Sequence, residues 1–256
     1  MCTITWWLAP DGAGYEVFFN RDERRTRQPA APPSLARRLE VDYLAPTDAD
    51  FRGTWLLVNN HGLTLAFINH YPANPKPSQK PARSRGMLAR DLADAASIAE
   101  VRARLAQVKL GHYGAFFIFV FERGQKPVKW TWDTRNLLEN PAAEPLPFFT
   151  SSSFRSEDIR RHRRKFFAEN WAQKNRLDSA GLAEFHLQTE PARPAFGVLM
   201  DRADARTVSF SHITVGPGQE VVFSYQARSP ANGSLFESPL TWHLPLTAQP
   251  PTQSAS

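Results

Sequence analysis

Short apolar runs separated by turn-forming residues are the dominant pattern along this chain. The first two runs, Cys2–Leu8 and Tyr15–Asn20, flank the polar and glycine-containing segment Ala9–Gly14. Two strand-like runs joined by a short turn predict a β-hairpin. Because a hairpin folds its second strand back beside its first, we expect the residues after Asn20 to lie close to Cys2.

A second hairpin is predicted by the runs Thr54–Val58 and Leu63–Asn69, which are joined by Asn59-Asn60-His61-Gly62. Asparagine and glycine tolerate the left-handed backbone conformations that tight turns need. The proline-rich and charged segments Gln28–Leu44 and Pro72–Arg83 are typical of irregular surface loops.

Six later apolar runs predict further strands, and they are mostly consecutive in sequence, as in antiparallel sheets. Phe116–Phe121 is apolar on both faces, which is typical of a strand inside a layered structure. The six runs are Phe116–Phe121, Val128–Trp132, Phe148–Thr150, Phe196–Met200, Thr207–His212 and Glu220–Tyr225.

Two short helices are expected in the first half of the chain and one long helix in the second. Ser84 can cap a helix that begins near Arg85, and Ser97 can cap the next. The long helix is predicted from about Ser156 to Asn175. Helices on the outside with sheets between them are the natural way to bury such strands, so the pattern favours an α+β fold.

Size and composition narrow the class of protein. The 256 residues, 42% of them hydrophobic, suit one globular domain, which we place at residues 1–245 with a flexible tail at 246–256. The net charge is +6, but the arginines are spread along the chain, so no nucleic-acid partner is predicted. The apolar N-terminal run is too short for a signal sequence or a membrane span. A single cysteine fits a reducing compartment, and we expect a cytoplasmic protein.

The densest basic cluster is Arg160–Lys165, which lies in the predicted long helix. Apolar residues around it recur at helical spacing. The cluster has two interpretations, a solvated helix face or a site for an anionic group such as phosphate or carboxylate.

No cofactor is predicted. The seven histidines are scattered without the spacing of metal ligands, and no glycine-rich phosphate loop or dinucleotide motif is present. The serine run Ser151–Ser153 lacks the glycine-flanked turn of a serine hydrolase.

The strongest chemical signal is Cys2 itself. If Met1 is removed, Cys2 carries a thiol and a free α-amine in one residue. A free cysteine has a pKa of about 8.5 and an α-amine one of about 7.7 to 8.0, so the amine can accept the thiol proton near neutral pH. One residue then supplies both a nucleophile and its base.

Five sequence motifs together resemble the NRDE family, also called transport and Golgi organisation 2-like proteins. Such proteins are similar to N-terminal nucleophile hydrolases, notably penicillin V acylases and bile salt hydrolases. The resemblance implies a four-layer αββα sandwich and hydrolysis of a linear, non-peptide amide through a thioester at Cys2. The motifs are Met1-Cys2-Thr3, Asn20-Arg21-Asp22-Glu23, Gly53-Thr54-Trp55, Val58-Asn59-Asn60-His61-Gly62-Leu63 and Ser84-Arg85-Gly86.

The same resemblance implies roles for individual residues. Asp22 would orient the Cys2 amine, and the Asn59 side chain would donate to the oxyanion. The hydrolases carry an arginine just before their asparagine, where Phe19 stands here, so Asp22 is favoured over Arg21. Arg21 would act by favouring the thiolate, and it would leave the strand on the face opposite to Asn20.

The expected substrate-binding residues are Asn20, Trp55, Ser151 and Ser152. The serines stand where the hydrolases have a second oxyanion asparagine, so a serine hydroxyl or the backbone would replace it. A different class of function is also open, because the resemblance extends to proteins linked to membrane trafficking and to haem or acyl lipids. The fold would then serve as a carrier in which Cys2 binds without turnover.

Overall fold

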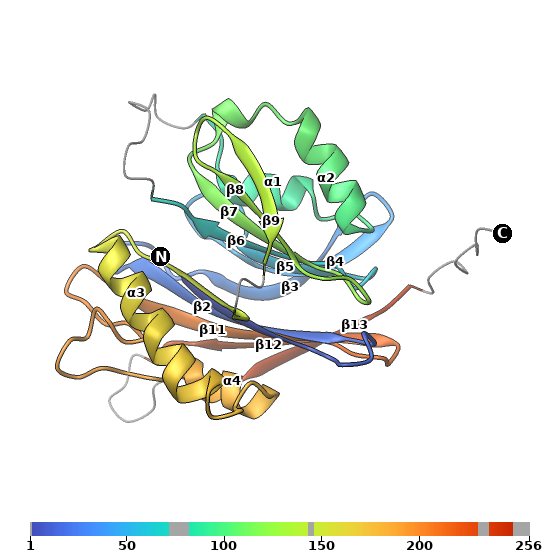
Figure 1. Cartoon of the computed structure of the whole chain (residues 1–256). Helices are drawn as coiled ribbons and strands as arrows, with labels where there is room; N and C mark the ends of the chain where they lie inside the picture. Colours follow the sequence, from blue (N-terminus) through green and yellow to red (C-terminus); the bar gives the residue numbers. More distant parts are fainter. Residues whose placement is uncertain (1, 72–81, 143–145, 230–235, 248–256) are drawn as a thin grey trace.

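The computed structural model describes residues 2–71, 82–142, 146–229 and 236–247. Two antiparallel sheets face each other in the middle of the molecule, and helices cover their outer faces (Figure 1). The six-stranded sheet has the order β10-β1-β2-β11-β12-β13, and the seven-stranded sheet runs from β3 to β9 in chain order. The expected αββα sandwich is therefore confirmed.

The strands of the six-stranded sheet come from both ends of the chain: β1 (Cys2–Leu8), β2 (Tyr15–Arg24), β10 (Phe148–Ser151), β11 (Ala205–Val215), β12 (Glu220–Ala227) and β13 (Leu240–Pro245). The seven-stranded sheet is contiguous in sequence: β3 (Ala31–Arg38), β4 (Val41–Thr47), β5 (Leu56–Asn59), β6 (Thr64–Asn69), β7 (Phe116–Phe121), β8 (Val128–Trp132) and β9 (Leu137–Pro141).

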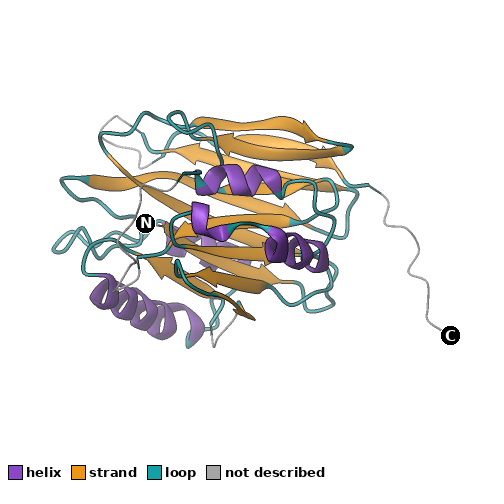
Figure 2. Cartoon of the chain, turned by 90° about the horizontal axis from the view of Figure 1, so that it is seen from above, coloured by secondary structure: helices purple, strands orange, loops and turns teal. Residues whose placement is uncertain are grey.

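The helices form the two outer layers (Figure 1), and Figure 2, seen from above, shows the upper layer in front of the strands. Helices α1 (Arg85–Asp91) and α2 (Ile98–Gln107) cover the seven-stranded sheet, whereas α3 (Ser156–Phe167) and α4 (Ser179–His186) cover the other. The predicted serine caps are confirmed, since Ser84 accepts the N–H of Gly86 and Ser97 that of Glu100. Two short helical segments complete the fold, the 3₁₀ segment Leu110–His112 and the π-helical segment Ala168–Ala172.

Three apolar clusters hold the layers together. One lies between the sheets and contains Ile4, Trp6 and Phe119, which are at most 1% exposed. The second lies between the seven-stranded sheet and α1 and α2, and the third between the six-stranded sheet and α3 and α4. Burial on both faces explains why β7 is apolar throughout.

Two sequence expectations about the fold are wrong. Gln28–Leu44 is not an irregular excursion, because it forms β3 and the first part of β4. β3 is an edge strand with mostly exposed side chains, where Pro32 and Pro33 are tolerated. Phe196–Met200 is buried but forms no strand. The long helix changes to π geometry after Phe167. Residues 72–81 and 248–256 lie outside the described residues.

Candidate active site

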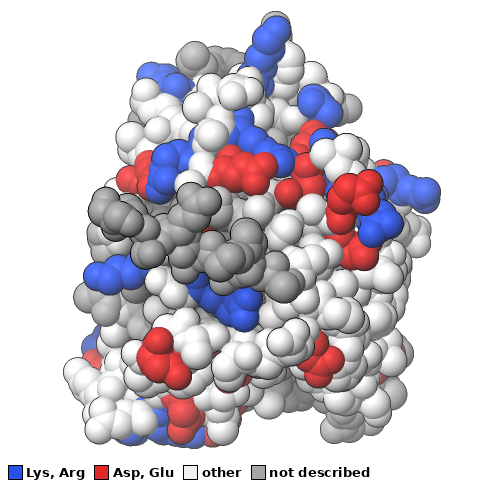
Figure 3. Space-filling view, turned by 90° about the vertical axis from the view of Figure 1, so that its right-hand side faces the viewer, with Lys and Arg blue, Asp and Glu red and all other residues white. Residues whose placement is uncertain are grey.

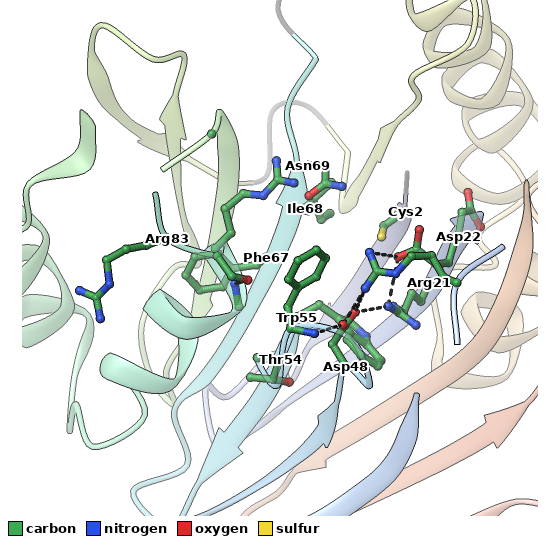
Figure 4. Close-up of a pocket in the computed structure, with 18 of the residues that line it drawn as sticks. Cys2, Arg21, Asp22, Asp48, Thr54, Trp55, Phe67, Ile68, Asn69 and Arg83 are labelled. Atoms are coloured by element: carbon green, nitrogen blue, oxygen red, sulfur yellow. Dashed lines mark hydrogen bonds and ion pairs between the residues drawn. The ribbon is translucent and has the colours of Figure 1, made fainter. Parts of the chain in front are cut away.

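Cys2 stands at the start of β1, on the wall of a cavity of about 520 Å³ (Figure 4). In the antiparallel register it pairs with Arg21 of β2 and Ser151 of β10. The cavity is lined by residues of both sheets and of the N-terminal end of α1. The predicted hairpin thus brings Asn20-Arg21-Asp22-Glu23 beside Cys2, as expected from the turn between the two strands.

A close backbone contact builds one wall of this cavity. A Cβ atom at Gly53 would lie 2.5 Å from the backbone of Gly86, and one at Gly86 would lie 2.8 Å from Thr54 N, so only glycine fits at either position. The N–H of Thr54 donates to the Gly86 carbonyl at 3.1 Å. The contact joins the motifs Gly53-Thr54-Trp55 and Ser84-Arg85-Gly86. Trp55 and Arg85 of these motifs line the cavity.

Arg21 is held on the cavity side by charge and by an aromatic ring. Its guanidinium donates to Asp48 at 2.8 Å and to Glu23 at 3.1 Å, and lies 4.0 Å from the centre of the Trp55 ring. Asp48 also pairs with Arg27 at 2.6 Å. Asp48 was not predicted from the sequence, although an aspartate in a turn after a strand is a weak signal for such a role.

The Asp22 carboxylate points toward Arg163 of α3, and the residue also forms part of the cavity wall. Its Oδ1 accepts a hydrogen bond from the Thr207 hydroxyl at 2.6 Å. Its Oδ2 has no hydrogen-bond partner among the described residues and lies 4.0 Å from Nη1 of Arg163. Burial raises the pKa of the Asp22 carboxyl, and the charge of Arg163 opposes that rise. The result is a buried carboxylate oxygen with an unused acceptor position.

Arg163 is the buried member of the basic cluster, at 2% exposure. Its Nη1 donates to the hydroxyls of Thr3 and Thr150, each at 3.0 Å, and the Thr150 hydroxyl donates to the carbonyl of Cys2 at 3.3 Å. Neither interpretation of the cluster anticipated this cation behind the Cys2 strand. At Arg163 the helix face is neither solvated nor open to a ligand.

The environment of Cys2 raises the pKa of its thiol. Burial raises its pKa and the Asp22 carboxylate adds to that effect, whereas the Asp22 backbone N–H and the Arg21 charge act in the opposite direction. A nucleophilic Cys2 therefore needs a base at hand to remove its proton.

Asn59 does not lie where the resemblance placed it. Its side-chain nitrogen donates to the carbonyls of Ala93 at 2.9 Å and Ala95 at 2.7 Å, and its Oδ1 accepts the N–H groups of His61 and Leu63. Both amide protons are thus used in hydrogen bonds to the segment between α1 and α2, and Asn59 is absent from the cavity lining. The oxyanion role for Asn59 is corrected to that of a turn anchor.

Three expected substrate-binding residues also lie off the cavity. Asn20 is fully buried and donates to the carbonyls of His186 and Val198 on the α4 side. Its separation from Arg21 follows from strand alternation, as predicted. Ser151 donates to the Asn69 carbonyl, and the Ser152 hydroxyl donates to the carbonyl of Phe154. Trp55 does line the cavity.

Two cavity residues carry useful polar groups that the sequence did not single out. Asn69, the last residue of β6, is labelled beside Ile68 in Figure 4, and Arg85 begins α1. The Ser84-Arg85-Gly86 motif was the signal for Arg85, whereas nothing local marked Asn69.

Neither a metal cluster nor a membrane span is found in the described parts of the chain. No group of three or more His, Cys, Asp and Glu side chains there is arranged to hold a metal ion. None of the helices combines the length and apolar character needed to cross a membrane. Positive and negative side chains are interspersed on the face seen in Figure 3, which offers no large patch of one sign.

Comparison with known protein families gives a match for this chain. The family model described as Transport and Golgi organisation 2 matches residues 1–194, well over half of the chain. The chain belongs to this family. The matched range contains every motif on which the resemblance rested. No match was found among curated proteins.

Solved structures similar to this chain include an acylase, a hydrolase and an amidase. Penicillin V acylase from Agrobacterium tumefaciens is 10% identical with a TM-score of 0.54, over 88% of this chain and 83% of that one. The C2A mutant of conjugated bile acid hydrolase from Clostridium perfringens is 12% identical, with a TM-score of 0.52 over 96% and 92%. The Caenorhabditis elegans N-acylethanolamine-hydrolyzing acid amidase ortholog is 14% identical, with 0.54 over 96% and 100%. At these identities the likeness establishes the fold.

Proposed function

We propose that this protein hydrolyses the C–N bond of a linear, non-peptide amide, with Cys2 as the nucleophile after removal of Met1. The observation that carries the proposal is the position of the chain's one cysteine, on the wall of a cavity and beside a buried carboxylate with an unused oxygen. The fold shared with an acylase, a hydrolase and an amidase, by their names, supports the same class of reaction.

The reaction would proceed in two halves. The α-amine of Cys2 takes the thiol proton, and the sulfur attacks the amide carbon. As the C–N bond breaks, the α-ammonium gives its proton to the leaving amine, and a thioester remains on Cys2. Water then attacks the thioester while the α-amine accepts one of its protons. The C–S bond breaks, and the thiolate regains a proton as the carboxylic acid leaves.

Asp22 would orient the α-amine in this scheme. An ammonium group next to Asp22 Oδ2 would give that oxygen the hydrogen bond that it lacks. Arg163 would help to keep the carboxylate ionised despite its burial. The role is one of position, because the amine itself carries the proton.

We assign the oxyanion donor to Asn69 in place of Asn59. Asn69 lines the cavity, and its backbone carbonyl accepts a hydrogen bond from the hydroxyl of Ser151, which pairs with Cys2 across the sheet. A fixed donor of this kind lowers the barrier by about 3 kcal/mol. Arg21 would favour the thiolate from the same cavity.

The proposal is tested with a panel of fluorogenic N-acyl amides, using wild type and Cys2→Ala. We expect the wild type to hydrolyse at least one member and Cys2→Ala to hydrolyse none. Turnover that survives in Cys2→Ala would contradict the proposal. Rapid alkylation of Cys2 without turnover of any amide, together with a copurifying haem or acyl lipid, would instead support the carrier.

A further inference from the structure

The charged residues of the cavity are unevenly paired. The described lining contains four arginines, namely Arg21, Arg27, Arg83 and Arg85, and three acidic residues, namely Asp22, Glu23 and Asp48. Asp48 pairs with both Arg21 and Arg27, and Glu23 with Arg21 at 3.1 Å. Arg83 lies 3.4 Å from Asp91, outside the cavity lining, and Asp22 faces Arg163.

Arg85 differs from the other three arginines. No carboxylate of the described residues lies within 4.0 Å of its guanidinium, whose one hydrogen bond there runs from Nη1 to the Ala115 carbonyl at 2.9 Å. Burial lowers its pKa, and the negative forms of Tyr71, Cys2 and Glu23 act against that. Arginine nevertheless keeps its charge in proteins. The cavity therefore contains a partly buried cation whose charge is not neutralised by a neighbouring carboxylate.

The surroundings of Arg85 are apolar on the side of the seven-stranded sheet. Trp55, Phe67 and Ile68 line the same cavity, and each is at most 8% exposed. Such a wall suits an alkyl or aromatic group, and a single cation beside it fixes one polar end of a ligand. The backbone contact between Gly53 and Gly86 joins the two segments that carry Trp55 and Arg85, and both residues line the cavity.

We infer that Arg85 binds an anionic group, a carboxylate or a phosphate monoester, of an otherwise apolar ligand lying on Trp55, Phe67 and Ile68. The inference rests on the proposed function in one respect, since the ligand that it describes would be the substrate of Cys2. A partly buried charge is costly unless it is paired, and an anion bound there would pair with Arg85. The planar guanidinium can meet either group with two parallel hydrogen bonds.

The test compares the binding of three probes with one alkyl chain, which are hexanoate, hexyl phosphate and 1-hexanol. None contains an amide bond, so calorimetric titration of the full chain gives an answer whether or not the protein is an enzyme. We expect the wild type to bind at least one of the two anions about 10- to 100-fold more tightly than 1-hexanol, as for a charged hydrogen-bonded pair. The ratio between hexanoate and hexyl phosphate identifies the preferred anion.

Variants then assign the preference to Arg85. Arg85→Gln should bring the affinities for anion and alcohol to within about threefold, and Arg85→Lys should keep part of the preference because it keeps the charge. Arg102→Gln removes the same charge on α2, where Arg102 pairs with Glu139, and should keep the full preference. Equal binding of anions and alcohol by the wild type, no binding of either anion, or an undiminished preference in folded Arg85→Gln would each overturn the inference.

Discussion

Arginines on the two sides of the sheet that carries Cys2 differ in how their charge is paired. On the helix side, the face covered by α3 and α4, Arg163 is 2% exposed and is held by two threonine hydroxyls and a nearby carboxylate. On the cavity side, Arg85 has a carbonyl partner and no carboxylate among the described residues. A cation with its partners in place fixes the chain, whereas one without a counter-charge is available to a ligand.

This difference also separates the two groups next to Cys2. The side chains of Asp22 and Asn20 make their hydrogen bonds on the helix side, although Asp22 also lines the cavity. Arg21 belongs to the cavity side with Trp55. Strand alternation assigns neighbouring residues to different tasks, so one tetrapeptide serves both the framework and the cavity.

Removing Arg163 should have the largest effect on stability. Arg163→Met leaves Asp22 buried without its counter-charge, so we expect a loss of about 3 to 5 kcal/mol in the free energy of unfolding. Urea denaturation measures this loss. The double variant Arg163→Met with Asp22→Asn should recover part of it, and a double variant no more stable than Arg163→Met would show that Arg163 does not act through Asp22.

Asn69 and Asn59 offer a matched pair for the cavity side and the framework. Asn69→Ala should lower kcat about 100- to 1000-fold with little change in stability, because it removes an oxyanion donor. Asn59→Ala should destabilise the fold by about 2 kcal/mol or more, because the carbonyls of Ala93 and Ala95 lose a buried donor. Kinetics and urea denaturation of both variants decide the assignment, and the reverse pattern would refute it.

Acid should weaken the helix side through His186. His186 is the last residue of α4, and its side chain is fully buried. Burial lowers its pKa from 6.5 to about 3. The unfolded chain then binds the proton more readily, so stability falls as the pH drops from about 6.5 toward 3. Between pH 7 and pH 4.5 the loss from this group is about 3 kcal/mol. His186→Gln should reduce that pH dependence in urea denaturation, and an unchanged slope would exclude His186 as its source.

Local sequence signals predicted the parts of this molecule that local interactions decide. Both hairpins and the caps at Ser84 and Ser97 were predicted correctly, since a few neighbouring residues determine them. The strand β3 was missed because its prolines and charges are tolerated only at a sheet edge, and edges are set by the whole topology. Apolar Phe196–Met200 resembled a strand, yet it packs as a buried loop on α3 and α4.

The sequence predicted which segments meet at Cys2, but not how the side chains around it are paired. The closeness of Asp22 to Cys2 followed from the first hairpin, whereas Asn59 was misplaced because its turn looks the same whichever way the side chain points. The burial of Arg163 within a charged helix and the pairing at Asp48 depend on contacts between distant segments. Such contacts leave no periodic trace in the sequence.

The most direct test of the central claim is the intact mass of the chain. It is measured for the resting protein and for a sample that is quenched with acid during turnover of a fluorogenic amide. The account predicts a mass without Met1, and during turnover an added acyl group that maps to Cys2 and is released by hydroxylamine, as a thioester is. A chain that retains Met1, or one that turns over substrate without any acyl group on Cys2, would contradict it.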